Sequence, residues 1–342
     1  MYGKAFAPEY QGQLRDMSVN TAYEDVLAAA REREFRAVDK GSGLELAQAR
    51  LAVAEACRRL GKLDEADAAW RGSYRAARSA GEPGAMAWAL WSGGTLARQR
   101  GQLTAAVRWL SSGRDLAKQA GDQLAYGYSL AGIAETLRIR GDHEEARELH
   151  EQLLAEARER GECRHTVWAL EGLAQLDRNA GDLDSAWQRF AEAAKIAKEG
   201  GDERGLAWAL RGLADVNSLC GEHDEALRLL TWGEHICRRM DLSSALAYNR
   251  KMRGNVLFRA CWYSEAARTY RDARKMFRSI NEPRGAALAE LGLLKSLDKL
   301  GRPRPATERE LYALLDTLDS RELRHTKRMV EEAIIEMREM AA

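Results

Sequence analysis

Proline and cysteine are both scarce in this sequence. Five prolines occur in 342 residues, and none interrupts the periodic apolar patterns described below. Because proline removes a backbone donor and disrupts helix interiors, this distribution is compatible with long helices. The five cysteines are odd in number and show no C-x-x-C spacing. They predict free thiols in a reducing compartment and no metal site.

Other absences exclude whole classes of protein. Residues 1–13, MYGKAFAPEYQGQ, contain no apolar stretch typical of a signal peptide. No run of apolar residues is long enough to span a membrane. We therefore expect a cytoplasmic protein that does not bind membranes. The formal net charge is only +1, so no overall field attracts nucleic acid. A strong excess of Arg over Lys, with abundant Ala and Gly, is typical of a bacterial source.

Sequence motifs of catalysis and metal binding are also missing. No H-E-x-x-H, Walker loop or G-x-S-x-G elbow occurs, and the six histidines are scattered. The acidic segments 142–145 and 222–225 fall at expected helix starts, where negative charge is favourable. We expect no cofactor and no metal, and a non-catalytic role is favoured over an enzyme.

Glycine, by contrast, recurs in a regular pattern. Two series each repeat every forty residues and lie half a period apart. The first comprises Gly61, Gly101, Gly141, Gly181, Gly221 and Gly301, with Cys261 in the missing place, and the second comprises Gly41, Gly81, Gly121, Gly161 and Gly201, followed by Asp241 and Asn281. Glycine ends helices because it tolerates left-handed backbone, and Asn and Asp are the next best residues there. The pattern predicts a two-helix unit repeated in tandem, which is a solenoid.

Residues 165–200 show the pattern of one unit most clearly. The first helix of this unit carries a large apolar residue, a Leu and a small residue at Leu170, Leu173 and Ala174, and a turn glycine follows at Gly181. The second helix carries an Ala, an aromatic residue and another Ala at Ala186, Phe190 and Ala193. This order resembles the tetratricopeptide repeat, whose usual period is about 34 residues. The longer period of 40 is similar to the repeats of kinesin light chains and of bacterial peptide-sensing regulators. The resemblance implies an all-α, right-handed superhelix of about seven helical hairpins.

The ends of the chain differ from the repeats. We expect seven units over residues 44–319, a tail with one helix over 1–43, and a capping helix over 320–342. The apolar side chains of the capping helix share one face: Met329, Val330, Ala333, Ile334 and Met337. This face docks either on the last repeat or on a second copy of the chain, which would give a homodimer. Residues 1–19 are too short for a helix-turn-helix module, so we expect no direct nucleic-acid binding.

A second periodicity lies off the core stripe of the first helix in each unit. An aromatic row stands one period apart: Trp88, Tyr128, Trp168, Trp208 and Tyr248. At about 100° per residue, this row points away from the stripe centred on Leu170. Three further rows share its face. They contain Trp91, Glu171, Arg211 and Lys251, then Glu135, Gln175, Asp215 and Asn255, and then Arg98, Arg138 and Arg178.

The resemblance implies that these rows line a concave groove, because first helices form the inner wall of tetratricopeptide superhelices. Aromatic rings give contact area, and arginine clamps carboxylates or phosphates. We therefore expect an adaptor that binds a peptide segment or partner protein there. Two alternatives stay open. In the first alternative, the rows are structural: the aromatic rings pack against the preceding unit, and the Glu and Arg rows pair with each other at three-residue spacing. Otherwise the groove holds a small molecule, as in a sensor or an unusual biosynthetic enzyme.

Overall fold

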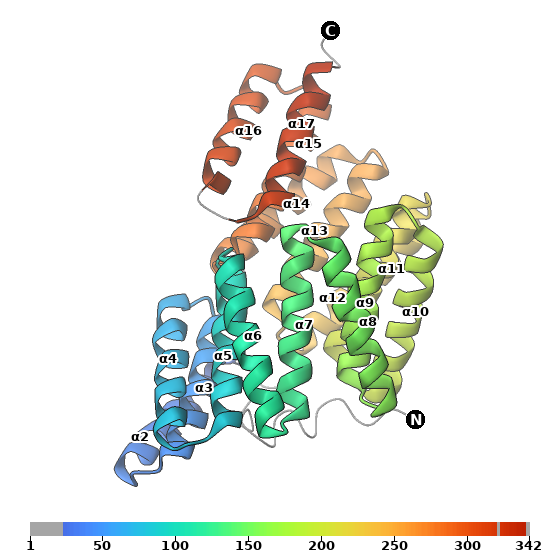
Figure 1. Cartoon of the computed structure of the whole chain (residues 1–342). Coiled ribbons are helices and arrows are strands. Elements are labelled where there is room, and N and C mark those ends of the chain that lie inside the picture. The colour runs from blue at the N-terminus through green and yellow to red at the C-terminus, as the bar shows by residue number, and fades with distance from the viewer. Residues whose placement is uncertain (1–22, 320–321, 340–342) are drawn as a thin grey trace.

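The computed structural model describes residues 23–319 and 322–339, and within them every regular element is a helix (Figure 1). In chain order the helices are α2 (Tyr23–Asp39), α3 (Gly43–Arg59), α4 (Leu63–Ser79), α5 (Pro83–Gln99), α6 (Leu103–Ala120), α7 (Gln123–Arg140), α8 (His143–Glu159), α9 (Cys163–Ala180), α10 (Leu183–Gly200), α11 (Glu203–Leu219), α12 (His223–Arg239), α13 (Ser243–Arg259), α14 (Tyr263–Ser279), α15 (Pro283–Lys299), α16 (Arg304–Asp319) and α17 (Arg324–Glu339). The predicted all-α class is confirmed. No helix among these residues is long and apolar enough to cross a membrane.

The helices pair into seven hairpins, from α3–α4 to α15–α16, with α2 before them and α17 after them. Every glycine of the two series adopts a positive φ, as the periodicity predicts. Asp241, Cys261 and Asn281 take over this role in the later turns, and they are the only non-glycine residues of the described chain with positive φ. Three segments lie outside the described residues: 1–22, 320–321 and 340–342. The first includes the start of the predicted N-terminal helix at residues 20–22, and the last includes the end of the predicted capping helix.

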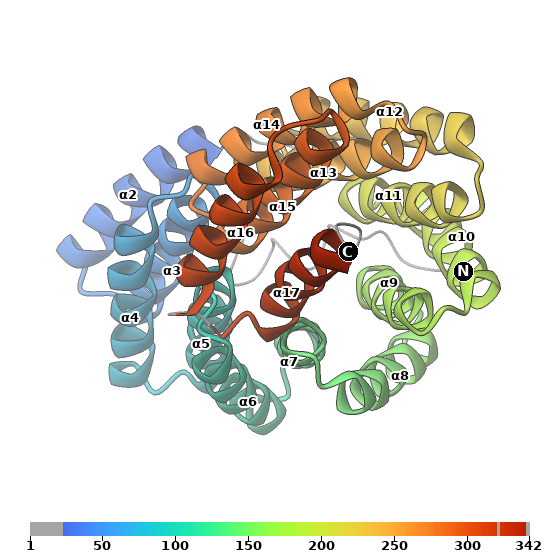
Figure 2. The same cartoon turned by 90° about the horizontal axis from the view of Figure 1, so that it is seen from above.

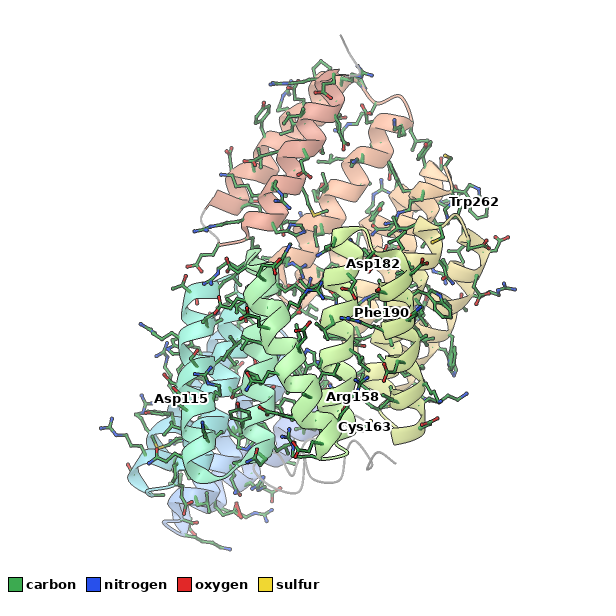
Figure 3. The ribbon with its side chains drawn as sticks, turned by 45° about the vertical axis from the view of Figure 1, so that its right-hand side comes forward. Asp115, Arg158, Cys163, Asp182, Phe190 and Trp262 are labelled. Carbon is green, nitrogen blue, oxygen red and sulfur yellow. The ribbon has the colours of Figure 1, made fainter. Side chains whose placement is uncertain are left out.

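Neighbouring hairpins interlock through one large side chain that packs over a glycine. Phe190 of α10 lies against Gly212 of α11, where an added Cβ would stand 2.3 Å from the ring (Phe190 is labelled in Figure 3). His150 of α8 lies against Gly172 of α9 in the same way, with a Cβ distance of 2.2 Å. Close packing therefore requires the small residue, and the repeated core extends from each hairpin into the next.

The superhelix curves until its early and late hairpins touch. Seen from above, the hairpins wind around a central space until α14 and α15 return to the side of the molecule where α2 and α3 begin (Figure 2). Asn281 Nδ2 donates a hydrogen bond of 2.7 Å to the carbonyl oxygen of Gly61, and Gln99 Nε2 donates one of 3.1 Å to that of Ile280. We call this contact between the α3–α4 and α14–α15 turns the seam. It joins residues 220 and 181 positions apart and brings the early and late hairpins into contact around the groove.

The capping helix α17 docks within the same chain. Its apolar residues Val330, Ala333 and Ile334 are buried in a cluster that also includes Leu103 and Leu311. The backbone N–H of Glu322 donates to the Gly101 carbonyl oxygen at 3.1 Å. Of the two docking surfaces considered for this face, the structure of the single chain uses its own helices, and α17 lies beside α7 and α15 (Figure 2).

Alanine at Gly61 tests whether the seam forms in solution, and alanine at Gly81 is the matched control. The two glycines have φ values of 75° and 71°, so each substitution costs about 1–2 kcal/mol of backbone strain. A Cβ at Gly61 would also stand 2.9 Å from Ile280 Cα, whereas nothing lies within 4 Å of one at Gly81. We expect Gly61→Ala to lower the free energy of unfolding by about 1 kcal/mol more than Gly81→Ala. Backbone amides around Ile280 should also exchange faster with deuterium, and equal behaviour of the two variants would contradict the seam.

Candidate ligand-binding cavity

A cavity of about 250 Å³ lies inside the superhelix, and we call it the larger cavity. Its lining comes from α2 and from the first helix of each of the seven hairpins, namely α3, α5, α7, α9, α11, α13 and α15. A smaller cavity of about 70 Å³ adjoins it and shares Arg98, Trp168 and Trp208 among its lining residues. The first helices therefore form the inner wall that surrounds this space.

Most of the predicted site residues lie along these cavities. Those lining the larger one are Arg98, Glu135, Arg138, Trp168, Gln175, Trp208, Arg211, Tyr248 and Lys251. The smaller one adds Trp91, Tyr128 and Glu171. Trp88, Arg178, Asp215 and Asn255 line neither cavity. The structure thus brings together predicted residues from five helices, α5, α7, α9, α11 and α13, while it places the remaining four against neighbouring helices.

The aromatic row divides into Trp88 and Tyr128, which pack with Trp91 and reach at most the smaller cavity, and three residues that face the larger cavity. Trp88 and Trp91 are only 2% and 4% exposed, and their rings lie 5.4 Å and 5.3 Å from that of Tyr128. The indole N–H of Trp88 donates to Asp122 at 2.9 Å. Trp168, Trp208 and Tyr248 are half-buried and face the larger cavity. Packing against neighbouring repeats therefore accounts for Trp88 and Tyr128, as the structural alternative expects.

The acidic and arginine rows pair largely with each other. Arg138 holds Glu135 by two hydrogen bonds of 2.8 and 2.7 Å, which is the three-residue pairing considered from the sequence. Asp215 is instead paired across helices with Arg178 at 3.2 Å and Arg259 at 2.9 Å. These ion pairs explain why Arg178 and Asp215 do not line the larger cavity.

Asn255 turns away from the cavity for a similar reason. Its side-chain oxygen accepts a hydrogen bond of 2.8 Å from the hydroxyl of Tyr270, which belongs to the second helix of the same hairpin. The amide is therefore committed to the contact between α13 and α14. The place of Asn255 in the repeat did not predict this contact, because Gln175 holds the same place in α9 and lines the larger cavity.

Two carboxyl groups near the cavities differ in protonation. Burial by itself would raise the pKa of Glu135, but Arg138, Arg98 and Arg284 outweigh it and lower this pKa to about 2. Burial raises the pKa of Glu171 well above its usual range, and Arg211 opposes this only in part. Glu135 is therefore a carboxylate at neutral pH, whereas burial shifts Glu171 toward its protonated form.

Positive charge predominates along the larger cavity. The basic side chains that line it are Arg58, Arg59, Arg98, Arg138, Arg204, Arg211, Lys251 and Arg284, and the acidic ones are Glu135 and Glu282. The site prediction did not include Arg204 or Arg284. The sequence contained a pattern that could have identified them. Arg164 and Arg204 stand four positions before Trp168 and Trp208 of the aromatic row, and Arg284 stands four positions before Leu288, which occupies the same place in the last repeat. The whole chain carries a net charge of only +1, so this excess is local.

The chain shares its repeat and its fold with known proteins. Residues 125–199 match the family model of the tetratricopeptide repeat, which confirms the predicted resemblance. A Rap protein complexed with Competence and Sporulation Factor is 16% identical, with 86% of this chain and 91% of that chain covered and a TM-score of 0.56. The Rap conjugation gene regulator of the plasmid pLS20, in complex with the Phr* peptide, is 16% identical, with 86% and 78% covered and a TM-score of 0.66.

A third solved structure, a putative kinesin light chain from Podosopora anserina, is 17% identical, with 57% of this chain and 95% of that chain covered and a TM-score of 0.40. No curated protein sequence matches the chain. The family model and the two Rap structures show a solenoid of tetratricopeptide-like hairpins.

Proposed function

We propose that this chain is a non-catalytic intracellular binding protein that holds a segment of a peptide or partner protein in the larger cavity. The observation that carries this proposal is the lining, because the first helices of all seven hairpins contribute to one surface. A peptide as ligand is supported by the two Rap structures of the same fold, which contain Competence and Sporulation Factor and the Phr* peptide.

Trp208 is the central contact residue in this proposal. Two guanidinium groups lie near its ring, with Arg204 Cζ at 5.4 Å and Arg211 Cζ at 5.3 Å from the ring centroid. Its buried indole N–H has no hydrogen-bond partner among the described residues. A buried donor without a partner costs about 1–3 kcal/mol. A carbonyl oxygen of a bound peptide would accept this hydrogen bond and remove the cost.

A compact small molecule is the second candidate ligand. It is favoured by the seam, because Asn281 and Gln99 join the early and late hairpins and limit entry of a long chain. A cavity of about 250 Å³ also lies near the lower end of the size range of small-molecule sites, which starts at about 300 Å³. The peptide proposal therefore requires that only a few residues of the segment occupy the cavity.

A peptide selection with two matched tryptophan variants tests the proposal. Heptapeptides are selected from a random library on the full chain, and their affinities are measured by fluorescence anisotropy. We expect Trp208→Ala to weaken binding of a selected peptide at least tenfold, with unchanged helical content by circular dichroism. Trp232 lies on the outer helix α12 and is 44% exposed, so Trp232→Ala should leave the affinity unchanged. Failure to select any peptide, or equal losses in both variants, would contradict the proposal.

A further inference from the structure

Three basic side chains of the larger cavity lack a salt bridge to any described residue: Arg98, Arg211 and Lys251. Arg98 donates one hydrogen bond of 3.2 Å, to the carbonyl oxygen of Gly132. The Arg211 guanidinium lies over the rings of Trp208 and Tyr248, at 5.3 and 5.5 Å. Most other arginines near the cavity are paired; Arg138, for example, is bound to Glu135. These three cations are therefore available to a ligand.

The unpaired cations converge on Tyr248. Arg98 from α5, Arg211 from α11 and Arg284 from α15 all interact electrostatically with it. Lys251 lies one helical turn further along the same helix as Tyr248. Four basic groups from four separate first helices thus surround one place on the cavity wall.

The protein supplies fewer carboxylates than basic groups at this place, although Glu282 interacts with both Tyr248 and Arg284. Glu135 is already bound through both carboxylate oxygens by Arg138. The Glu282 carboxylate accepts a hydrogen bond from the N–H of Gly285 at the start of α15. Burial lowers the pKa values of Arg98 and Arg211, and it lowers that of Lys251 to about 8. Buried charge without a counter-charge is unfavourable, so an anion that enters the cavity would relieve this cost.

We propose that Arg98, Arg211, Lys251 and Arg284 form an anion-binding subsite around Tyr248 that receives a carboxylate or phosphate group of the ligand. Arginine suits this role because its planar guanidinium matches the geometry of these oxyanions. This inference rests on the proposed function only where it identifies the ligand that carries the anionic group as an acidic peptide. The subsite itself can be tested with small anions.

The first test measures thermal melting of the full chain with citrate and with inorganic phosphate, at an ionic strength kept constant with sodium chloride. We expect both anions to raise the melting temperature of the wild type in a saturable manner. The double variant Arg98→Gln/Arg211→Gln should bind each about a hundredfold more weakly, because each lost charge-assisted contact contributes about tenfold. Arg75 is exposed on the outer helix α4, so Arg75→Gln should behave as the wild type.

The same experiment distinguishes the subsite from a structural role of the arginines. Without anion, the double variant should melt at the wild-type temperature or above it, because it no longer holds two charged groups out of water. A large drop in that temperature would mean that the arginines hold the fold, and it would overturn the proposal. Lys251→Gln provides an independent variant and should also weaken citrate binding. An anion effect that is equal in all variants would indicate an adventitious ion only and would equally overturn the subsite.

A second test separates this inference from the proposed function. Peptides selected on the chain are compared with versions in which every Asp and Glu is replaced by Asn and Gln. We expect the amide versions to bind at least tenfold more weakly. Cavity-bound peptides that show no such preference would overturn the subsite and leave the proposed function intact. Citrate binding without any peptide binding would support the subsite and contradict the proposed function.

Discussion

Replacing Glu135 by glutamine is expected to lower the free energy of unfolding by about 3 kcal/mol at neutral pH. The carboxylate is bound bidentately by Arg138, and its pKa of about 2 reflects strong stabilisation of the charged form against burial. The amide would leave Arg138 and Arg98 without their nearest negative charge, and breaking a buried pair typically costs about 3–5 kcal/mol. Urea denaturation monitored by circular dichroism measures the change.

Glu148 provides the matched control for Glu135. It is exposed on the outer helix α8, so Glu148→Gln should change the free energy of unfolding by no more than about 0.5 kcal/mol. The Glu135→Gln variant should also bind citrate more tightly than the wild type, because the cavity then holds fewer negative charges. Equal stability of the two variants, together with unchanged citrate binding, would contradict the assignment of Glu135 as the main internal counter-charge.

The pKa of Glu135 also fixes a pH dependence. The group ionises at about 2 in the folded chain and near its ordinary value in the unfolded chain, so the unfolded state binds more protons between these values. The stabilisation from Glu135 is therefore fully present above about pH 4.5 and is lost as the pH falls toward 2. The Glu135→Gln variant should lack this acid-dependent loss.

Acidification should destabilise the chain at a higher pH through His150. This side chain is 0% exposed, and burial lowers its pKa to about 4, with Glu135 opposing that effect and Arg138 adding to it. Unfolded histidine titrates near about 6.5, so between these values the unfolded state binds the additional proton. Stability should fall by up to about 3 kcal/mol as the pH drops from 6.5 to 4.

Leucine at position 150 is expected to remove this loss. Leu110 and Leu230 occupy the equivalent position in other hairpins, and both ring nitrogens of His150 lack a hydrogen-bond partner among the described residues. At pH 5 we expect His150→Leu to be about 2 kcal/mol more stable than the wild type. His235 is exposed on α12, so His235→Leu should follow the wild-type pH profile. A His150→Leu variant as sensitive to acid as the wild type would contradict this assignment.

Local rules made the repeats predictable from the sequence. Gly61 and its counterparts end helices because the left-handed backbone favours glycine, and this requirement acts within a few residues of the chain. The seam was not predictable in this way. It depends on small rotations between successive hairpins, which add up until Asn281 reaches Gly61. The sequence predicted a concave groove but not the contact between its early and late hairpins.

The sequence predicted which face of the first helices carries the candidate site, but not which residues on that face line the cavity. All five aromatic residues stand at one position of the repeat, yet Trp88 is packed away while Trp208 lines the larger cavity. The difference arises three positions further on, where Trp91 fills the space beside Trp88 and Arg211 stands beside Trp208. A large apolar neighbour seals the first ring, whereas a charged neighbour needs polar surroundings and keeps the second ring at the cavity.

The central claim, that an anion enters the larger cavity and binds around Tyr248, is tested most directly by a crystal structure of the full chain soaked in sodium selenate. Anomalous scattering locates selenium without assumptions about the ligand. We predict a selenate ion inside the larger cavity, with its oxygens within about 3 Å of the Arg98 and Arg211 guanidinium nitrogens. Selenate on the outer surface only, with none in the cavity, would contradict the claim.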